Sequence, residues 1–229
     1  MECTKFTGRA NINLYCGDCM EAMAGMDAGR YSLGLVDPPY GLGEDSDKIR
    51  EYNSKPCKSW KTCSPKIYEK KEWDKERPEK HYFNELLRVC INQIIWGGNY
   101  FADLLPPSGG WVVWDKKVGM PTFSDGELAW CSKTNSVKIA RILWAGYLKC
   151  EKTNRIHPTQ KPIALYKWLL TNYAKPGDTI LDTHGGSMSI AIAAWDLGFD
   201  LDLYELDADY YKAGVERVKR HTAQGQFDL

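Results

Sequence analysis

Short apolar runs alternate along the chain with segments that repeat their apolar residues at helical spacing. The runs predict strands at residues 12–15, 31–36, 94–96, 111–114, 137–144, 179–181 and 201–204. Apolar residues three or four positions apart predict helices at residues 21–26, 82–89, 163–173, 187–197 and 208–220. Strands that alternate with helices indicate an α/β fold, with a mainly parallel sheet and helices on both of its faces.

The length of 229 residues fits one domain, which we expect to span residues 1–229. Residues 43–80 are polar and charged and show no apolar periodicity. A stretch of that length without its own secondary structure is usually functional or disordered. We therefore interpret residues 43–80 as a long basic loop that is mobile in the absence of a partner.

The composition, with 43% hydrophobic and 26% charged residues, is that of an ordinary globular protein. No apolar stretch follows Met1, and no apolar run has the length needed to cross a bilayer, so we expect a cytoplasmic protein without a membrane segment. Its eight cysteines are then expected to be reduced thiols. Cys16 and Cys19 have C-x-x-C spacing, but no second pair completes a zinc set, and we expect no metal.

The formal net charge is zero, yet the charges are segregated along the chain. Residues 48–71 hold eight Lys or Arg against two acids, and residues 131–161 hold seven against one. Residues 176–211 hold eight acids and no Lys or Arg. Basic segments can neutralise phosphates and release counterions, so the two basic segments favour nucleic acid as a partner. Asp115 and Lys116 are interpreted as an ion pair near the site.

The strongest chemical signal is the tetrapeptide Asp37-Pro38-Pro39-Tyr40, directly after an apolar strand. The exocyclic amino group of a nucleobase is a poor nucleophile because its lone pair is delocalised into the ring. A carboxylate and a backbone carbonyl held by rigid prolines can accept hydrogen bonds from that amino group while it pyramidalises. Tyr40 offers a flat face on which an extruded base can stack.

A second signal lies in the last third of the chain, where a strand ends at Asp182 and a glycine turn leads into a helix. Glycines such as Gly185 and Gly186 let the backbone approach a ligand, and the helix amino terminus offers free N–H groups. Glu205 lies 20 residues beyond Gly185 at the end of the next strand, where an acid can reach a ribose diol, and Asp207 is the neighbouring candidate. These features alone also fit a dinucleotide-binding enzyme.

Asp37-Pro38-Pro39-Tyr40 resembles the signature of the amino-group DNA methyltransferases, which methylate adenine N6 or cytosine N4. Its first residue resembles the adenine branch more than the cytosine branch, where Ser is usual. Three further segments are similar to the family: residues 17–19 to the turn that contacts the adenine of the cofactor, residues 96–101 to the lining of the base pocket, and residues 157–162 to the segment over the methionine end of the cofactor. Their order resembles the circularly permuted β class.

The resemblance implies a Rossmann-like S-adenosylmethionine-dependent methyltransferase fold and transfer of a methyl group to adenine N6 in double-stranded DNA. The base would be flipped and the transfer direct, with a target-recognition segment at about residues 116–156. Catalysis would fall to Asp37, Pro38, Pro39 and Tyr40. The residues implied to bind the cofactor are Asp18, Cys19, His157, Thr159, Gln160, Lys161, Asp182, His184, Gly185, Gly186, Ser187, Ser189, Glu205 and Asp207.

The chain departs from the family pattern at two positions: Met188 stands where the family has a glycine, and His184 where it has an aromatic residue. A long side chain at position 188 either weakens cofactor binding or points into the core, and an intact site is expected. Four alternatives stay open: cytosine N4 as the target, RNA as the substrate, a dinucleotide-dependent dehydrogenase, and a catalytically silent DNA-binding homologue. The recognition sequence, a partner restriction enzyme and a homodimer are left open.

Overall fold

The computed structural model describes residues 1–42, 74–117, 124–145, 148–149 and 155–224. The chain divides into two compact units, residues 1–38 with 79–229 and residues 39–78, and each is described by itself. Most of the long basic loop expected at residues 43–80 lies outside the described residues. Among the residues described, no helix combines the length and the apolar character that a bilayer crossing requires.

The first unit is built on a sheet in the order β1-β2-β11-β10-β3-β4-β6-β5-β7. The five strands from β2 to β4 in this order are all parallel, whereas β1 runs antiparallel to β2, and β6 runs antiparallel to both β4 and β5. The strands are β1 Glu2–Phe6, β2 Ile12–Cys16, β3 Tyr31–Val36, β4 Cys90–Trp96, β5 Trp111–Asp115, β6 Gly126–Cys131, β7 Val137–Arg141, β10 Thr179–Asp182 and β11 Asp200–Glu205. A separate pair comprises β8 Trp144–Ala145 and β9 Leu148–Lys149.

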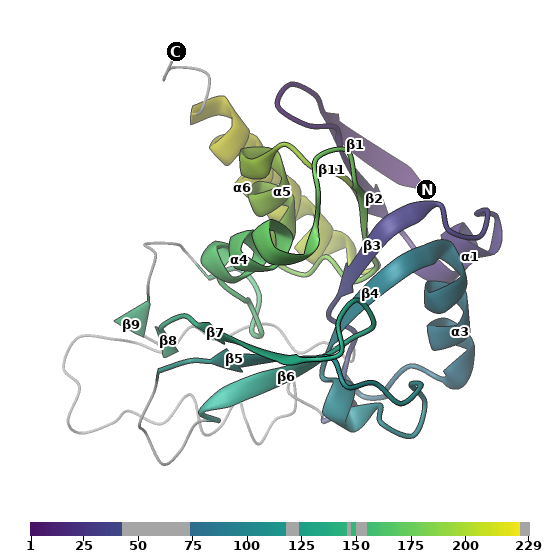
Figure 1. Ribbon diagram of the computed structural model, residues 1–229. Helices are drawn as coiled ribbons and strands as arrows, with labels where there is room; N and C mark the ends of the chain where they lie inside the picture. The colour runs from purple at the N-terminus through teal and green to yellow at the C-terminus, as the bar shows by residue number, and fades with distance from the viewer. Residues whose placement is uncertain (43–73, 118–123, 146–147, 150–154, 225–229) are drawn as a thin grey trace. The chain divides into compact units, whose positions relative to one another are not determined.

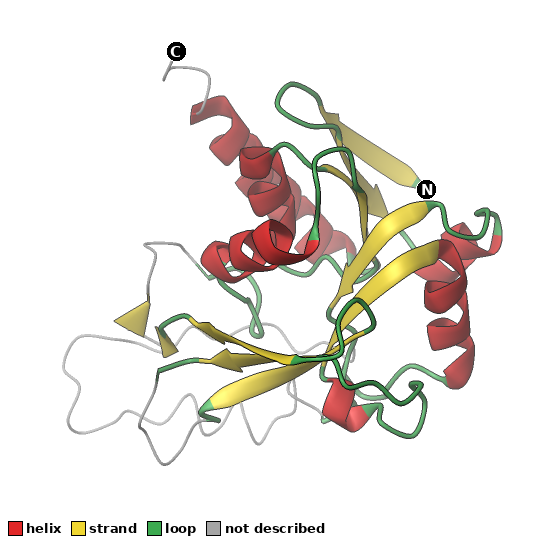
Figure 2. Cartoon of the chain, viewed as in Figure 1, coloured by secondary structure: helices red, strands yellow, loops and turns green. Residues whose placement is uncertain are grey.

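Helices cover both faces of the parallel part of the sheet (Figures 1 and 2). Helices α4 Ile163–Tyr173, α5 Ser189–Leu197 and α6 Ala208–Gln224 pack together on one face, and α1 Cys19–Ala24 and α3 Lys80–Val89 pack together on the other. A short 3-10 turn, η1 Gly98–Tyr100, follows β4. The predicted α/β architecture is therefore confirmed.

The buried residues explain why these segments form the centre of the fold. Strand β10 is apolar at Ile180 and Leu181, which are fully buried because helices lie on both sides of it. Helix α5 is apolar around its whole circumference, and every residue from Ser189 to Trp195 is buried. A helix of that kind is stable only in a protein interior, where it packs on α4 and on β11. This packing fixes the turn that precedes α5.

The direction of winding reverses between β10 and β3. The chain passes from β10 through α5 to β11 on one side, and from β3 through α3 to β4 on the other. In open α/β sheets, ligands bind outside the carboxyl ends of the strands at such a reversal point. The ends of β3 and β10, where Asp37 and Asp182 lie, are therefore the expected place for a site.

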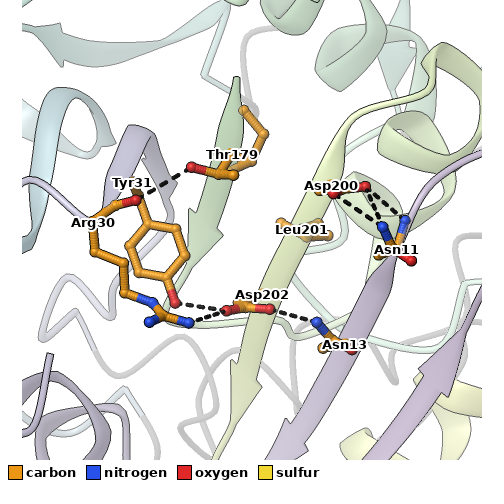
Figure 3. Close-up of a pocket in the computed structure, with 9 residues that line it drawn as sticks. Asn11, Asn13, Arg30, Tyr31, Thr179, Asp200, Leu201 and Asp202 are labelled. Carbon is orange, nitrogen blue, oxygen red and sulfur yellow. Dashed lines mark hydrogen bonds and ion pairs between the residues drawn. The ribbon is translucent and has the colours of Figure 1, made fainter. Parts of the chain in front are cut away.

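A pocket of about 330 Å³ lies at the opposite edge, at the amino ends of the same strands (Figure 3). Its polar side chains bond to one another across the strands. The Tyr31 hydroxyl donates to Asp202 at 2.7 Å, and the Asn13 amide donates to the other oxygen of Asp202 at 2.8 Å. The Asn11 side chain donates to both oxygens of Asp200 at 3.1 Å. This polar cluster ties the strand beginnings together.

Two strands of the main sheet were not expected from the sequence. Strand β1 is an edge strand without a single buried residue, so it carries no apolar pattern. Strand β6 begins with Gly126 and Glu127, and only its last three residues are buried. The strand expected at residues 137–144 divides into β7, which ends at Arg141, and β8, which belongs to another sheet.

Candidate active site

Four acidic residues reach the carboxyl edge of the parallel strands. Asp37 follows β3, Asp182 ends β10, Glu205 ends β11, and Asp18 lies two residues beyond β2. The pairing of β3, β10, β11 and β2 as consecutive neighbours brings these ends side by side. The structure thus gathers at one edge the acids that the sequence had placed in two distant halves of the chain.

Asp37 is held by a buried lysine. The Lys161 ammonium binds Asp37 Oδ2 and lies 3.3 Å from Glu127 Oε2, and its side chain is only 4% exposed. It also lies 5.3 Å from the centre of the Trp96 ring. Burial disfavours the charge on Lys161, but the two carboxylates outweigh burial and raise the pKa of its ammonium. Lys161 is therefore a permanent cation beside Asp37.

Glu127 continues this network. Its Oε1 binds the Lys116 ammonium at 2.6 Å, so that Lys116 and Lys161 flank one carboxylate. Burial opposes ionisation of Glu127, yet the two ammonium groups prevail and lower the pKa of its carboxyl group. The ion pair expected between Asp115 and Lys116 is wrong. Asp115 instead faces Arg141 at 3.8 Å, because successive residues of a strand point to opposite faces.

The tetrapeptide that follows β3 spans the boundary between the two units. Asp37 and Pro38 belong to the first unit, and Pro39 and Tyr40 begin the second. Within the second unit, the backbone N–H groups of Tyr40 and Gly41 donate to Asp74 Oδ1 at 2.8 and 3.0 Å. Asp74 is almost fully buried. This residue, which the sequence did not single out, therefore fixes the turn after the prolines.

The glycine turn between β10 and α5 is built for close backbone approach. A Cβ on Gly185 would lie 2.3 Å from the Leu203 side chain, so a larger residue there would force Leu203 to move. Gly186 has a φ of +48° and donates its N–H to Glu205 Oε2 at 2.6 Å. The other oxygen of Glu205 accepts the Asp207 N–H at 2.8 Å. Glu205 thus holds both the glycine turn and the start of α6.

Met188 has a left-handed backbone conformation, with a φ of +55°, which glycine adopts without steric strain. Its side chain is fully buried and points into the core towards Gly214 of α6. Two possibilities were open for this residue, and the structure shows the inward one. The Arg217 guanidinium secures the same turn, donating to the Ser187 carbonyl at 2.6 Å and to Ser189 Oγ at 2.9 Å.

Asp182 and His184 are both neutral at neutral pH. Burial raises the pKa of Asp182 to about 8, even though the His184 N–H donates to its Oδ1 at 3.0 Å. Burial lowers the pKa of His184 to about 4. The His184 Nδ1 lies 2.9 Å from the Thr183 hydroxyl, which contacts the Tyr82 hydroxyl at 2.7 Å. His184 therefore replaces an aromatic residue as an uncharged ring.

The segment from His157 to Lys161 lies against the glycine turn. A Cβ on Gly186 would be 3.7 Å from the His157 ring, whose other neighbour is the Tyr210 ring, with centroids 4.3 Å apart. The Thr159 hydroxyl lies 3.1 Å from His157 Nδ1. Gln160 accepts the Ile156 N–H, and its buried Nε2 has no hydrogen-bond partner among the described residues. This amide is a donor available for a ligand.

Asp18 and Asp207 act as helix caps. Asp18 Oδ1 accepts the Met20 N–H at 2.8 Å at the start of α1. Asp207 Oδ1 accepts the N–H groups of Asp209 and Tyr210 at 2.9 and 3.0 Å at the start of α6. Cys19 is buried, and burial raises the pKa of its thiol to about 12, so it is no thiolate. The described contacts of these three residues are structural.

The fold and the acid-lined strand ends define an α/β protein with a candidate ligand site at the reversal point of its sheet. Residues 108–216 match the N6_N4_Mtase family model, a DNA methylase. The Type II methyltransferase M2.MboI of Moraxella bovis is 24% identical over 227 residues, covering 80% of this chain and 78% of that protein. The DNA adenine methyltransferase YhdJ of Escherichia coli strain K12 is 38% identical over 88 residues, covering 37% of this chain and 29% of that protein.

Two solved structures share the fold. PvuII DNA methyltransferase (cytosine-N4-specific) superposes with a TM-score of 0.57 at 13% identity, covering 94% of this chain and 92% of that one. The M1.HpyAVI–SAM complex superposes with a TM-score of 0.51 at 17% identity, covering 90% and 99%. The predicted methyltransferase fold is confirmed, and residues 108–216 are similar to the N6/N4 amino DNA methyltransferases.

Proposed function

We propose that this protein is an S-adenosylmethionine-dependent methyltransferase that acts on the exocyclic amino group of a base in DNA, with adenine N6 as the target. One observation carries the proposal: β3 and β10 pair in parallel, so that Asp37 and the cofactor-side Asp182 end at the same edge of the sheet. An acceptor for an amino group and an acidic glycine turn therefore follow adjacent strands.

The residues present fit S-adenosylmethionine. The ligand carries an amino group, a carboxylate and a ribose diol. Asp182 offers a buried carboxyl group that can ionise beside the amino group, Glu205 an acid for the diol, and Gln160 a buried amide N–H for an acceptor. Gly185 and Gly186 form the tight turn beside these residues, packed against Leu203 and His157. When bound, the cofactor supplies an electrophilic methyl group on a sulfonium.

The role of Asp37 follows from the chemistry of the amino group. Two acceptors, the Asp37 carboxylate and the Pro38 carbonyl, take hydrogen bonds from the two amino hydrogens and localise the lone pair on nitrogen. Tyr40 supplies a stacking face for the flipped base, and Pro39 stiffens the turn between them. The transfer is then direct and needs no covalent bond to the protein.

Adenine is favoured over cytosine by the residue type at position 37 and by the relative YhdJ, whose name specifies adenine. The similarity to the cytosine-N4-specific PvuII enzyme keeps cytosine as the second candidate. Both amino groups make the same demand on Asp37. The choice between them depends on the walls of the base pocket rather than on the transfer chemistry.

DNA as the substrate is supported by the relatives and by charge. Lys138 and Arg141 are exposed on the edge strand β7, within the target-recognition segment expected at residues 116–156. Not every basic side chain of residues 131–161 is available to a phosphate, however, since Lys161 is committed to two carboxylates and the Arg155 guanidinium donates to the Pro158 carbonyl. A double-stranded target with the base flipped remains our proposal.

The experiment is methyl transfer from labelled S-adenosylmethionine to duplex DNA, single-stranded DNA and RNA, followed by digestion and mass spectrometry of the nucleosides. We expect N6-methyladenine in duplex DNA. N4-methylcytosine would shift the target to the second candidate, and a label only in RNA would contradict the choice of DNA. Cofactor binding without any product would identify a silent homologue, and binding of a nicotinamide dinucleotide in its place would indicate a dehydrogenase.

A further inference from the structure

Four charged side chains form a continuous chain at the end of β3, in the order Asp37, Lys161, Glu127 and Lys116. Lys161 bridges the two acids, and Lys116 binds the outer oxygen of Glu127 at 2.6 Å. The side chains of Asp37, Lys116 and Glu127 are 18%, 18% and 27% exposed, and Lys161 is 4% exposed. The charges balance, with two acids and two bases.

Such a network contributes little to stability, because removing charges from water costs about as much as their attraction returns. A buried ion pair between elements that are distant in sequence therefore needs another reason. Here the pair fixes the one carboxylate whose orientation matters for the proposed reaction. Among the described ion pairs, the pair of Lys167 on α4 with Asp196 on α5 shares no residue with this network.

The backbone of Lys161 is itself anchored to the cofactor side. Its carbonyl accepts a hydrogen bond from Ser189 Oγ at 2.8 Å, and Ser189 is the first residue of α5. Ser189 in turn accepts from Arg217 at 2.9 Å. One residue therefore connects the helix that follows the glycine turn, through its main chain, with Asp37, through its side chain.

Resting on the proposed function, we propose that Lys161 is a positioning residue for methyl transfer. It holds the Asp37 carboxylate in the orientation that receives the amino group, and Glu127 and Lys116 hold Lys161. A carboxylate has about four lone-pair sites on two oxygens, so Asp37 can accept from an amino group while Lys161 keeps Oδ2.

Several polar and charged groups surround Asp37. They are Lys161, the acids Glu127 and Asp182, the more distant Lys116, and the hydroxyl of Tyr166 on α4. Lys161 binds Oδ2 of Asp37 directly, so replacing Lys161 should release the carboxylate from this orientation.

The test compares Lys161→Met, Lys161→Arg and Glu127→Gln with the wild type. The matched control is Lys167→Met, which removes an ammonium at 2.7 Å from Asp196 on the other side of α4. For Lys161→Met we expect kcat to fall by about 100-fold, as a small misplacement of a reacting group can cause, with little change in KM for DNA. Lys161→Arg should recover part of kcat, and Glu127→Gln should fall between.

Cofactor affinity and unfolding give readouts that do not depend on activity. Calorimetric titration with S-adenosylmethionine should give a dissociation constant near that of the wild type for Lys161→Met. In thermal unfolding, the double variant Asp37→Asn/Lys161→Met should lose less stability than the two single variants lose together, because each single variant leaves a charge unpaired. Additive losses of stability would show that Asp37 and Lys161 do not form the ion pair described.

The outcomes separate this inference from the proposed function. An active wild type with Lys161→Met equal to the Lys167→Met control overturns the positioning role alone. A large loss of cofactor affinity with unchanged kcat at saturation makes Lys161 a cofactor contact and also overturns it. A wild type that methylates no nucleic acid overturns the proposed function, and the positioning role falls with it.

Discussion

Met188 and Gly214 are complementary: the side chain of Met188 fills the space beside α6 that the missing side chain of Gly214 leaves. A Cβ on Gly214 would lie 2.6 Å from the sulfur of Met188 and 2.7 Å from its Cγ. Met188 thus stands in a left-handed turn with its side chain on the core side. The departure from the family pattern at this position has a compensating residue 26 positions away on α6.

This complementarity predicts that Gly214→Ala destabilises the protein. The added methyl group overpacks a filled space, which costs about 1–3 kcal/mol in free energy of unfolding. The cost should be smaller in a Met188→Gly background, where the space is empty. Urea unfolding of the wild type, both single variants and the double variant measures the coupling.

The control is Gly25→Ala at the end of α1, where a Cβ meets only the Ala22 carbonyl at 3.8 Å and φ is −93°. That variant should unfold like the wild type. Equal costs of Gly214→Ala with and without Met188 would show that the two residues are not packed as described.

Stability should depend on pH through Asp182. Its pKa in the folded protein is about 8, well above the value of about 4 for an unfolded chain, so the folded state holds an additional proton between these values. The stabilisation that arises from this additional proton is complete below about pH 4, decreases as the pH rises and is absent above about pH 8. Asp182→Asn stays neutral at every pH. Its free energy of unfolding should therefore increase relative to that of the wild type by up to about 1.4 kcal/mol for each pH unit between these two values.

The measurement is unfolding of both proteins from pH 6.5 to 9. His184 titrates at about pH 4 in the folded protein and at about 6.5 in an unfolded chain, but it is present in both proteins and cancels from the difference between them. The difference between the two proteins in free energy of unfolding should increase up to about pH 8 and then become constant. A constant difference would contradict a neutral Asp182.

Cofactor binding should ionise Asp182, because the proposed partner is a cationic amino group. The affinity of the wild type for S-adenosylmethionine should then increase with pH between 6.5 and 8 and level off above. Asp182→Asn should bind about tenfold more weakly or worse, having lost a charged hydrogen bond. Calorimetry at pH 6.5, 7.5 and 8.5 tests both statements, and a pH-independent affinity in both proteins would remove Asp182 from the contact.

Substitutions of Glu205 and Asp207 should have different effects on stability and on cofactor affinity, although the two residues are neighbours. Asp207→Ala removes the cap of α6 and should cost about 1 kcal/mol of stability while leaving cofactor affinity near normal. Glu205→Gln alters the acid at the end of β11 that also holds Gly186, and should weaken cofactor binding. Melting temperatures and titrations of the two variants check this, and the reverse pattern would exchange their roles.

The bounds of helices and strands were predictable from the sequence where a buried apolar segment ends at a turn. Residues 31–36 and 163–173 were predicted with the bounds that β3 and α4 have in the structure, because an apolar run ends at two prolines in one case and at Pro176 in the other. The structure brings Asp18, Asp37, Asp182 and Glu205 together because all four lie at or after the ends of parallel strands. Parallel strands carry their carboxyl ends to one edge.

The network around Asp37 was not predictable in the same way. Glu127 lies on β6, which was missed because this strand starts with a glycine and an acid. The apolar run from Leu128 to Cys131 was the available signal. Lys161 was assigned to the cofactor by resemblance, whereas its described ammonium contacts are with Asp37 and Glu127. Spacing along a chain does not reveal which long side chain reaches which acid across a sheet.

The most direct test of the account is methyl transfer by Asp37→Ala, measured beside its cofactor affinity. The account predicts that the wild type places a labelled methyl group on an amino nitrogen of DNA. The variant should lose at least about two orders of magnitude in kcat, as expected when a group that stabilises the transition state is removed, while binding S-adenosylmethionine like the wild type. Turnover retained by Asp37→Ala would contradict the account.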